Sequence, residues 1–477
     1  MDKGKGGRLM TKKNILFLIA DDQRFDTIHA LGNSEIQTPH LDKLVARGVA
    51  FEEAFIPGGT SGAVCMPSRA MIQTGRYLTS WDNFGETLPQ EHALLGEELK
   101  EYGYQTCGIG KWHNGLESYH RSFSDGGKIF FGGMWDHWNV PVNKYHADGD
   151  YGAFKNFTYN PFSTNTIVKI PAEEIAIGKH STDLFADEII DYIENRRDKE
   201  VPFYLYGSFL APHDPRTMPE KFQKMYDPEK LTLPENFASE HAFSFDIQGE
   251  RDETLEAYPR TEAAIRQHLA DYYAMISHID ERIGTIVEAL ENQGVLDDTL
   301  IVFTGDNGIA IGQHGLMGKQ NLYDHSIRVP LIMAGPGIPQ NRRQAGKVFL
   351  LDLMPTILDY VGAPIVEGIA GQSLLPMIVD ESHGREVLYL MFTNKVRGIV
   401  TEEYKYLEYR TIDGHMFQLF DREKDPYETH NLIFEVGFEN IKKGLQKQMY
   451  ALAKDLGDTE FHQGKEYWDN YIHMRGM

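Results

Sequence analysis

Cysteine is scarce in this chain, which has only Cys65 and Cys107 among its 477 residues. A secreted domain that depends on disulfides would carry more of them. Cys107 lies in a short strand-like run, residues 104–110, where we expect a small buried thiol. Cys65 follows a glycine- and serine-rich stretch, residues 58–62, which predicts a turn in which the thiol can be reached.

Long apolar runs are also missing. No stretch approaches the ~20 residues that a membrane-spanning helix needs, so we expect no contact with a membrane. Residues 1–13 are basic and glycine-rich, but no apolar segment of a signal peptide follows them. We therefore expect residues 1–12 to be a disordered lead-in. The chain as written is expected to be cytoplasmic, or periplasmic or secreted if a leader was removed.

Positive charge is in deficit, since 47 lysines and arginines face 70 aspartates and glutamates, for a net charge of −23. A uniform nucleic-acid binder would be basic, so this balance argues against that class of protein. An anionic substrate would be repelled at long range. Any site for an oxyanion must therefore be a local cationic pocket.

Predicted buried strands alternate with predicted helices over most of the chain. Apolar runs at residues 14–20, 202–210, 300–304 and 329–335 predict strands of a mostly parallel sheet that is buried on both faces. Helical periodicity or capping predicts helices at residues 38–48, 91–102, 180–197, 264–292 and 351–361. Residues 121–166 and 218–260 are predicted to be long loops. The pattern indicates an α/β fold.

The pattern changes beyond about Gly371. Residues 386–419 alternate between apolar and polar side chains, which predicts an antiparallel sheet. Residues 438–456 are expected to form the final helix. We therefore divide the chain into a large α/β domain, residues 13–375, and a smaller C-terminal α+β subdomain, residues 376–477.

Polar residues follow several of the predicted strands. Asp21 and Asp22 follow the first strand, and Asp306 and Asn307 follow a later one. Ligands of open α/β sheets bind at the carboxyl ends of the strands, and oxygen ligands suit a hard cation. The alternative at each position is a solvated strand end with a turn.

Two further strands end in basic residues. Residues 104–110 lead into Lys111-Trp112-His113, where lysine and histidine two positions apart share one face of an extended chain. Lys111 and His113 could therefore reach one pocket. Residues 202–210 lead into Pro212-His213-Asp214-Pro215, where the prolines restrict the backbone around the histidine.

The segment Cys65-Met66-Pro67-Ser68-Arg69, followed by Thr74-Gly75-Arg76, resembles the C-x-P-S-R and T-G-R signature of the type I sulfatases. The strand-end motifs described above, and residues 38–48 and 419–432, resemble other segments of that family in the same order. The resemblance covers the chain from Lys13 to about Leu432. It implies an alkaline-phosphatase-like fold, a large mixed sheet flanked by helices with a smaller C-terminal antiparallel sheet and helix.

The resemblance also implies a chemistry. In this family a maturation enzyme oxidises the cysteine to formylglycine, whose hydrate attacks the sulfur of a sulfate ester. The implied ligands of the cation, Ca²⁺ in most members and with Mg²⁺ possible, are Asp21, Asp22, oxidised Cys65, Asp306 and Asn307. Arg69, Lys111 and Lys319 would supply positive charge. His213 would protonate the leaving alcohol, and His113 would take the proton that releases sulfate.

The substrate is less defined by sequence. Asp21-Asp22-Gln23-Arg24 is more similar to sulfatases that act on polysaccharides and glycosaminoglycan fragments than to arylsulfatases. Arg24 and Arg216 could bind a sugar carboxylate or a second sulfate, or each could be a structural ion-pair partner. The expected partner is a sulfated small molecule or oligosaccharide. The preferred substrate is a carbohydrate sulfate, such as a uronic acid 2-sulfate, ahead of aryl or steroid sulfates.

Three alternatives stay open. A phosphonate or phosphodiester hydrolase of the same superfamily would use the same nucleophile and metal ligands. A non-catalytic binding protein could share the scaffold, and a cysteine hydrolase could use Cys65 with a histidine. The sequence does not define the oligomeric state.

Overall fold

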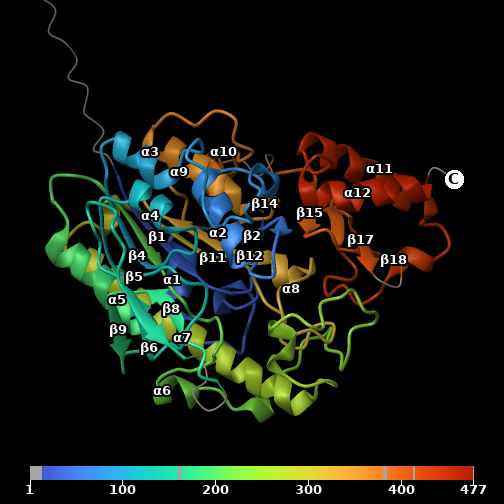
Figure 1. Cartoon of the computed structure of the whole chain (residues 1–477), viewed down its shortest axis with the longest axis horizontal. Coiled ribbons are helices and arrows are strands. Elements are labelled where there is room, and N and C mark those ends of the chain that lie inside the picture. Colours follow the sequence, from blue (N-terminus) through green and yellow to red (C-terminus); the bar gives the residue numbers. More distant parts are fainter. Residues whose placement is uncertain (1–12, 159–163, 380–383, 412–413, 476–477) are drawn as a thin grey trace, which may run out of the picture.

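The structure, a computed structural model, describes residues 13–158, 164–379, 384–411 and 414–475 (Figure 1). The predicted lead-in, residues 1–12, lies outside the described residues. None of the described helices combines the length and the apolar character that crossing a bilayer requires.

A nine-stranded sheet forms the centre of the larger part of the molecule. Its spatial order is β13-β2-β12-β11-β1-β10-β4-β5, and β14 also pairs with β2. Its strands are β1 (Asn14–Ala20), β2 (Val49–Phe55), β4 (Gln105–Lys111), β5 (Asp125–Phe130), β10 (Phe203–Ser208), β11 (Thr299–Gly305), β12 (Arg328–Ala334), β13 (Arg342–Gln344) and β14 (Val348–Phe349). Only β12 runs antiparallel to its neighbours. The predicted large, mostly parallel sheet is confirmed.

Helices cover both faces of this sheet. On β1, Ile15, Phe17 and Ile19 pack into one hydrophobic core, whereas Leu16 and Leu18 pack into the other. Figure 1 shows α2, α3 and α9 on one side of the sheet, with α5 and α7 on the other. Bounds are α1 (Pro39–Arg47), α2 (Cys65–Thr74), α3 (Leu95–Glu101), α4 (Leu116–Ser122), α5 (Ser181–Asp191), α6 (Glu220–Gln223), α7 (Glu262–Asn292), α8 (Asp324–Ile327), α9 (Leu353–Val361) and α10 (Leu375–Val379).

A second sheet lies in the C-terminal part, coloured red in Figure 1. Its order is β18-β17-β16-β15-β3, with strands β15 (Leu388–Phe392), β16 (Val396–Val400), β17 (Tyr404–Thr411) and β18 (Gly414–Asp421). The four form the predicted antiparallel sheet. The short strand β3 (Gly58–Gly59) pairs parallel to β15, so the chain enters this sheet just before Cys65. The division at residues 375 and 376 stays a proposal.

The prediction that residues 438–456 form the final helix is wrong. Helix α11 (Glu439–Asp455) matches it, but α12 (His462–Arg475) follows. Few residues of α12 are apolar, so the sequence shows no clear apolar stripe that would predict this helix. Tyr467 and Trp468 are nevertheless buried, and the Trp468 indole donates to the buried carboxylate of Asp458 at 2.8 Å.

The prediction of a continuous loop at residues 121–166 is also wrong. The end of α4, the edge strand β5 and the short strands β6 (Asn139–Val142) and β7 (Phe154–Phe157) lie there, and β7 and β6 pair with β8 (Val168–Pro171) and β9 (Glu174–Ile177). Residues 159–163 lie outside the described residues. Glycines disguise β5, because glycine has low strand propensity. A Cβ at Gly126 would lie 2.0 Å from the Tyr119 hydroxyl, so the close packing of α4 on β5 needs glycine there.

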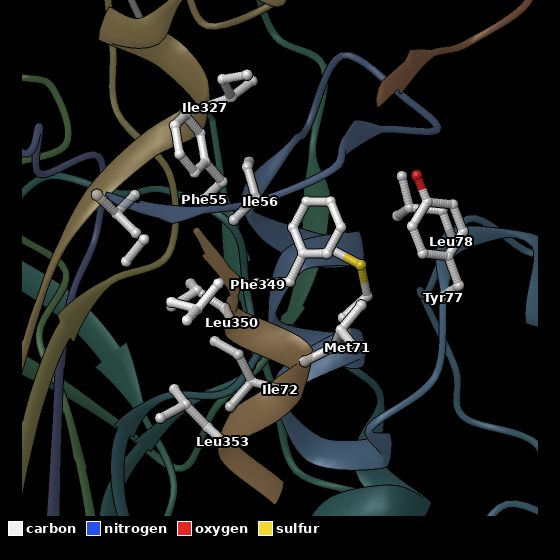
Figure 2. Packing of buried hydrophobic residues seen from close by; sticks show 14 of the residues in the cluster. Phe55, Ile56, Met71, Ile72, Tyr77, Leu78, Ile327, Phe349, Leu350 and Leu353 are labelled. Carbon is white, nitrogen blue, oxygen red and sulfur yellow. The ribbon is translucent and has the colours of Figure 1, made fainter. Parts of the chain in front are cut away.

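Helix α2 is held in place by apolar packing behind it. Met71 lies beside Phe349, and Ile72 lies beside Leu350 and Leu353 (Figure 2). All five side chains are at most 4% exposed. This packing fixes the helix whose first residue is Cys65.

We expect Met71→Ala to lower the free energy of unfolding by about 2–5 kcal/mol, because it leaves a cavity behind α2. The matched control is Met134→Ala, since Met134 is 42% exposed, and its cost should stay within about 0.5 kcal/mol. Urea unfolding of both variants measures the difference. Equal losses would contradict the role of this packing.

Candidate active site

The site lies where parallel strands end. Ala20 of β1 pairs with Gly305 of β11, so the residues that follow both strands meet at one edge of the sheet. Asp306 Oδ1 accepts hydrogen bonds from the backbone N–H groups of Asp22, at 3.0 Å, and Asn307, at 2.9 Å. The two polar pairs predicted from sequence are therefore in contact.

Cys65 begins helix α2 rather than lying in an open turn, and its side chain is only 2% exposed. The prediction of a readily reached thiol is wrong. Pro67 falls in the first turn of the helix, where its missing N–H costs nothing. Burial raises the pKa of the Cys65 thiol, although Lys111 and Lys319 oppose this. A thiolate is therefore not favoured, which argues against the cysteine-hydrolase alternative.

Ligand atoms of Asp21, Cys65 and Asp306 all lie within 4.8 Å of one another. Within the described part of the chain, Asp21 Oδ1, Asp22 Oδ2 and Asn307 Oδ1 are buried without a hydrogen-bond partner. Buried polar atoms are normally satisfied, so unpaired oxygens in one cluster call for a partner. A hard divalent cation with oxygen ligands fits this set.

Three buried cations face the three carboxylates. Lys111 Nζ contacts Asp21 Oδ2. Lys319 Nζ lies 2.5 Å from Asp22 Oδ1, and Arg69 Nε lies 2.8 Å from Asp306 Oδ2.

The pairing has unequal effects on two of the carboxyl groups. Burial favours the neutral form of Asp306, but Arg69, Lys111 and Lys319 outweigh it and lower the pKa of Asp306. Burial, followed by the neighbouring Asp306, raises the pKa of Asp21 to about 6. Asp21 therefore carries the less compensated negative charge of the two.

Lys111 and His113, which were predicted to share one face of the chain, both contact Cys65. Lys111 Nζ and His113 Nδ1 each lie 3.5 Å from Cys65 Sγ. Burial, followed by Lys111 and Arg69, holds the pKa of His113 well below its usual range, so its imidazole is neutral. The loop above His113 needs a glycine, because a Cβ at Gly133 would lie 2.7 Å from the imidazole.

His213 lies on the other side of the cluster. Its Nε2 is 3.7 Å from Asp22 Oδ2, and its Nδ1 donates to the carbonyl oxygen of Asp214 at 2.8 Å. The Asp214 carboxylate is 3.3 Å from the same Nδ1. Although Asp214 is buried, the ion pair with Arg251 and the proximity of His213 keep its pKa below its ordinary value.

The two predicted substrate-binding arginines have protein partners. Arg24 is 2% exposed and pairs with Asp26 at 2.8 Å. It also lines a cavity of about 820 Å³. Arg216 is half-buried and donates to His268 Nδ1 at 2.9 Å. The contact of Arg24 matches the ion-pair alternative, whereas Arg216 contacts a histidine rather than a carboxylate, and a contact with substrate stays a prediction for both.

A buried histidine pair, which was not predicted from the sequence, holds the His213 loop. His137 and His180 stack with ring centroids 5.0 Å apart and an interplanar angle of 6°. His137 Nε2 donates to the His213 carbonyl oxygen at 2.9 Å, and His180 Nε2 donates to that of Thr217 at 2.9 Å. No local pattern could indicate this pair, because its partners are distant in sequence.

The His137 contacts also define its tautomer. Since a carbonyl oxygen can only accept, Nε2 carries the proton, and Nδ1 accepts from the Ser181 hydroxyl at 2.6 Å. Burial lowers the pKa of His137 from 6.5 to about 4. The ring is therefore neutral near pH 7.

Comparison with known proteins agrees with this geometry. The family model described as Sulfatase matches residues 13–363. The chain belongs to the sulfatase family. It is therefore a sulfuric ester hydrolase. A second model, N-sulphoglucosamine sulphohydrolase, C-terminal, matches residues 312–455 of this sulfatase.

Curated relatives cover nearly the whole sulfatase chain. The ulvan-active sulfatase of Formosa agariphila is 29% identical and covers 98% of this chain and 86% of its own. The arylsulfatase of Clostridium perfringens is 30% identical, and the match covers 94% of this chain and 95% of the relative.

Solved structures support the predicted alkaline-phosphatase-like fold. The structure of BT4656 in complex with D-glucosamine-2-N,6-O-disulfate has a TM-score of 0.73 at 23% identity, covering 94% of this sulfatase and 99% of that chain. The phosphonate monoester hydrolase of Agrobacterium radiobacter has a TM-score of 0.71 at 22% identity, and the match covers 93% of this sulfatase and 96% of that chain. At these identities the similarity concerns the fold.

We expect the stability of this sulfatase to fall between pH 6.5 and about 4, partly because of His137. In this window the unfolded chain binds a proton at His137 that the folded chain does not, so lowering the pH favours unfolding. The contribution of His137 is about 3 kcal/mol at most. His137→Gln keeps an N–H donor and should lose less stability than the wild type between pH 7 and pH 4.5, measured by urea unfolding. Equal losses would contradict the assignment.

Proposed function

We propose that this sulfatase hydrolyses the sulfate ester of a sulfated carbohydrate, using a formylglycine made from Cys65 and a divalent cation. The observation that carries the proposal is the position of Cys65, within 4.8 Å of the carboxylate oxygens of Asp21 and Asp306 and 3.5 Å from both Lys111 Nζ and His113 Nδ1. A maturase in the producing cell would be a required partner. The maturase is needed because an unmodified Cys65 thiol lacks the second hydroxyl that the hydrated aldehyde carries.

The unpaired buried oxygens support a cation site. The residues that would hold it are Asp21, Asp22, Asp306, Asn307 and an oxygen on residue 65. When bound, a divalent cation supplies Lewis acidity that polarises the sulfate oxygens and favours an ionised nucleophile. Ca²⁺ and Mg²⁺ both accept such ligands, and Ca²⁺ tolerates a wider range of geometries.

Lys111 and Lys319 have a binding role in this proposal. A sulfate ester is anionic, so its oxygens must be neutralised before a nucleophile can approach the sulfur. Lys111 Nζ lies 3.5 Å from the Cys65 sulfur, and Lys319 Nζ pairs with Asp22 beside it. Arg69 is fixed by Asp306 and by the Ser208 hydroxyl, 2.7 Å from Nη1, so its charge stays beneath the nucleophile.

The two histidines divide the proton transfers. His213 donates through Nδ1 to the Asp214 carbonyl oxygen, and its Nε2 faces Asp22, so the imidazolium form would carry on Nε2 the proton that goes to the leaving oxygen. His113 is neutral because burial and the surrounding cations depress its pKa, so it can accept a proton from the group on residue 65. The first role is that of a general acid, and the second is that of a general base.

We expect Cys65→Ala to lose sulfatase activity by about a hundredfold or more, whereas Cys107→Ala, which removes the other buried thiol, should stay active. Mass spectrometry of the tryptic peptide covering residues 48–69 should show thiol-to-aldehyde conversion in active protein. Chelation should abolish turnover, and Ca²⁺ should restore it. If protein with an unconverted Cys65 thiol is active and this activity persists after chelation, the cysteine-hydrolase alternative is supported. If the thiol is unconverted and there is no turnover, the binding-protein alternative is supported.

Names of relatives guide the choice of substrate. Besides the ulvan-active sulfatase, they include an N-acetylglucosamine-6-O-sulfatase of Bacteroides thetaiotaomicron at 26% identity and an iduronate 2-sulfatase of Mus musculus at 28%. Sulfated sugars recur among them, which supports a carbohydrate sulfate. A uronate 2-sulfate is one specific form of this proposal, with Arg24 or Arg216 near a sugar carboxylate.

Two alternatives also have relatives. The Clostridium arylsulfatase supports an aryl or steroid sulfate. The multifunctional alkaline phosphatase superfamily protein PehA of Trinickia caryophylli, at 28% identity, supports activity on phosphorus esters. The same cations and nucleophile could act on either oxyanion.

A screen of defined sulfated saccharides, an aryl sulfate and a phosphate diester separates these substrates. The protein should be co-expressed with a maturase. We expect kcat/KM for at least one sulfated saccharide to exceed that for the aryl sulfate by about tenfold, since remote sugar contacts add binding energy in the transition state. Preference for the diester would contradict the proposal in favour of a phosphohydrolase.

A further inference from the structure

A short turn connects the loops of two proposed catalytic groups. It comprises Arg251 and the start of the 3-10 helix Asp252–Leu255, within the segment that the sequence predicted to be a loop. Asp252 and Glu253 are 5% and 1% exposed, which is unusual for acidic side chains. Each of the three side chains, Arg251, Asp252 and Glu253, contacts a different part of the wall around the site.

Glu253 fixes the backbone just before Lys319. Its carboxylate accepts from the backbone N–H of Met317 at 3.1 Å and from that of Gly318 at 2.8 Å. Arg260 Nη2 donates to the same carboxylate at 2.8 Å, so its charge is compensated. A buried carboxylate with several donors resists displacement, because each lost bond leaves an unsatisfied group.

Asp252 acts through a glutamine. Its Oδ2 accepts from Gln320 Nε2 at 2.7 Å, and Gln320 Oε1 accepts from the backbone N–H of Lys319 at 3.0 Å. Gln320 Nε2 also donates to the carbonyl oxygen of Gly62 at 2.9 Å. Asp252 therefore ties Lys319 to the loop that leads into Cys65.

Arg251 reaches the other side of the site. Its guanidinium contacts both oxygens of Asp214, whose Oδ1 lies 3.3 Å from His213 Nδ1. Its Nη1 also donates to Asp252 Oδ1 at 2.9 Å. Since two carboxylates already share its charge, Arg251 is suited to holding the His213 loop rather than to binding an anion.

We propose that Arg251, Asp252 and Glu253 form a positioning turn that couples the placement of His213 to that of Lys319. The inference rests on the proposed function, in which His213 protonates the leaving oxygen while Lys319 neutralises the oxyanion of the same ester. Both groups must be aligned at the same moment, and a misplacement of about 1 Å can cost about a hundredfold in rate. One rigid turn joined to both loops meets that requirement.

The first test is a double-mutant cycle between Glu253 and Lys319. Glu253→Gln is nearly isosteric but has one acceptor oxygen instead of two. Alone, it should lower kcat about 10- to 100-fold. In a Lys319→Met background it should lower kcat by less than about threefold more, because the positioned group is gone. Full additivity would overturn the role of Glu253.

The second test uses the leaving group. Arg251→Gln should slow hydrolysis of an alkyl sulfate by about tenfold more than that of a nitrophenyl sulfate, because only the poor leaving group depends strongly on protonation by His213. In a His213→Ala background Arg251→Gln should have little further effect. Equal slowing of both esters would overturn the role of Arg251.

A matched control separates positioning from general destabilisation. Asp458→Asn removes another buried carboxylate, which pairs with Arg397 at 2.6 Å in the C-terminal part. It should lower the thermal unfolding temperature but leave the ratio of alkyl to nitrophenyl sulfate rates unchanged. A shift in that ratio for Asp458→Asn would show that destabilisation alone explains the Arg251 result.

The double-mutant cycle between Glu253 and Lys319 can also be measured without turnover, as the affinity for inorganic sulfate determined by titration calorimetry. If the wild type hydrolyses no sulfate ester, the proposed function fails, but Glu253→Gln should still weaken sulfate binding only when Lys319 is present. Equal weakening with and without Lys319 would overturn the positioning turn while leaving the proposed function intact.

Discussion

The structure depends on the mutual compensation of charges that are buried at the ends of the strands. Asp21, Asp22 and Asp306 each contact a buried cation, and removing any one cation would leave an uncompensated buried carboxylate. Compensation is uneven, since the pKa of Asp306 falls whereas that of Asp21 rises to about 6. Asp21 also has an unpaired buried oxygen. A divalent cation beside Asp21 would compensate the carboxylate whose pKa burial and Asp306 raise.

The fold makes this compensation possible by bringing three kinds of element to one point. Parallel strands β1 and β11 deliver the carboxylates from their carboxyl ends, and β4 delivers Lys111 from its own. Helix α2 brings Cys65 to the same edge and inserts Arg69 beneath it, where Asp306 and Ser208 fix the guanidinium. The packing of Met71 and Ile72 behind the helix keeps that arrangement from shifting (Figure 2). The chemistry of the site thus depends on apolar contacts that never touch it.

The sequence predicted the innermost layer of the site far better than the layer around it. Asp21, Asp306 and Lys111 follow apolar strands, which placed them at strand ends, and the family resemblance then assigned them to one site. The partners that hold them have no local signature. His137 meets the His213 loop, and Glu253 meets the amides before Lys319, only after the chain has folded. Strand β5 and helix α12 were missed for a related reason, because glycine and polar residues conceal faces that become buried.

The same electrostatics gives the two histidines different surroundings. His113 lies among Lys111, Arg69 and Lys319, which together with burial depress its pKa and keep it neutral. His213 instead has a carboxylate oxygen near each ring nitrogen, from Asp22 at 3.7 Å and Asp214 at 3.3 Å. Positive groups thus lie around His113 and carboxylates lie beside His213, so two side chains of one residue type have opposite surroundings in one pocket. In the proposed mechanism His113 would act on the group at residue 65 and His213 on the leaving oxygen, and their different surroundings are consistent with both proton transfers in one pocket.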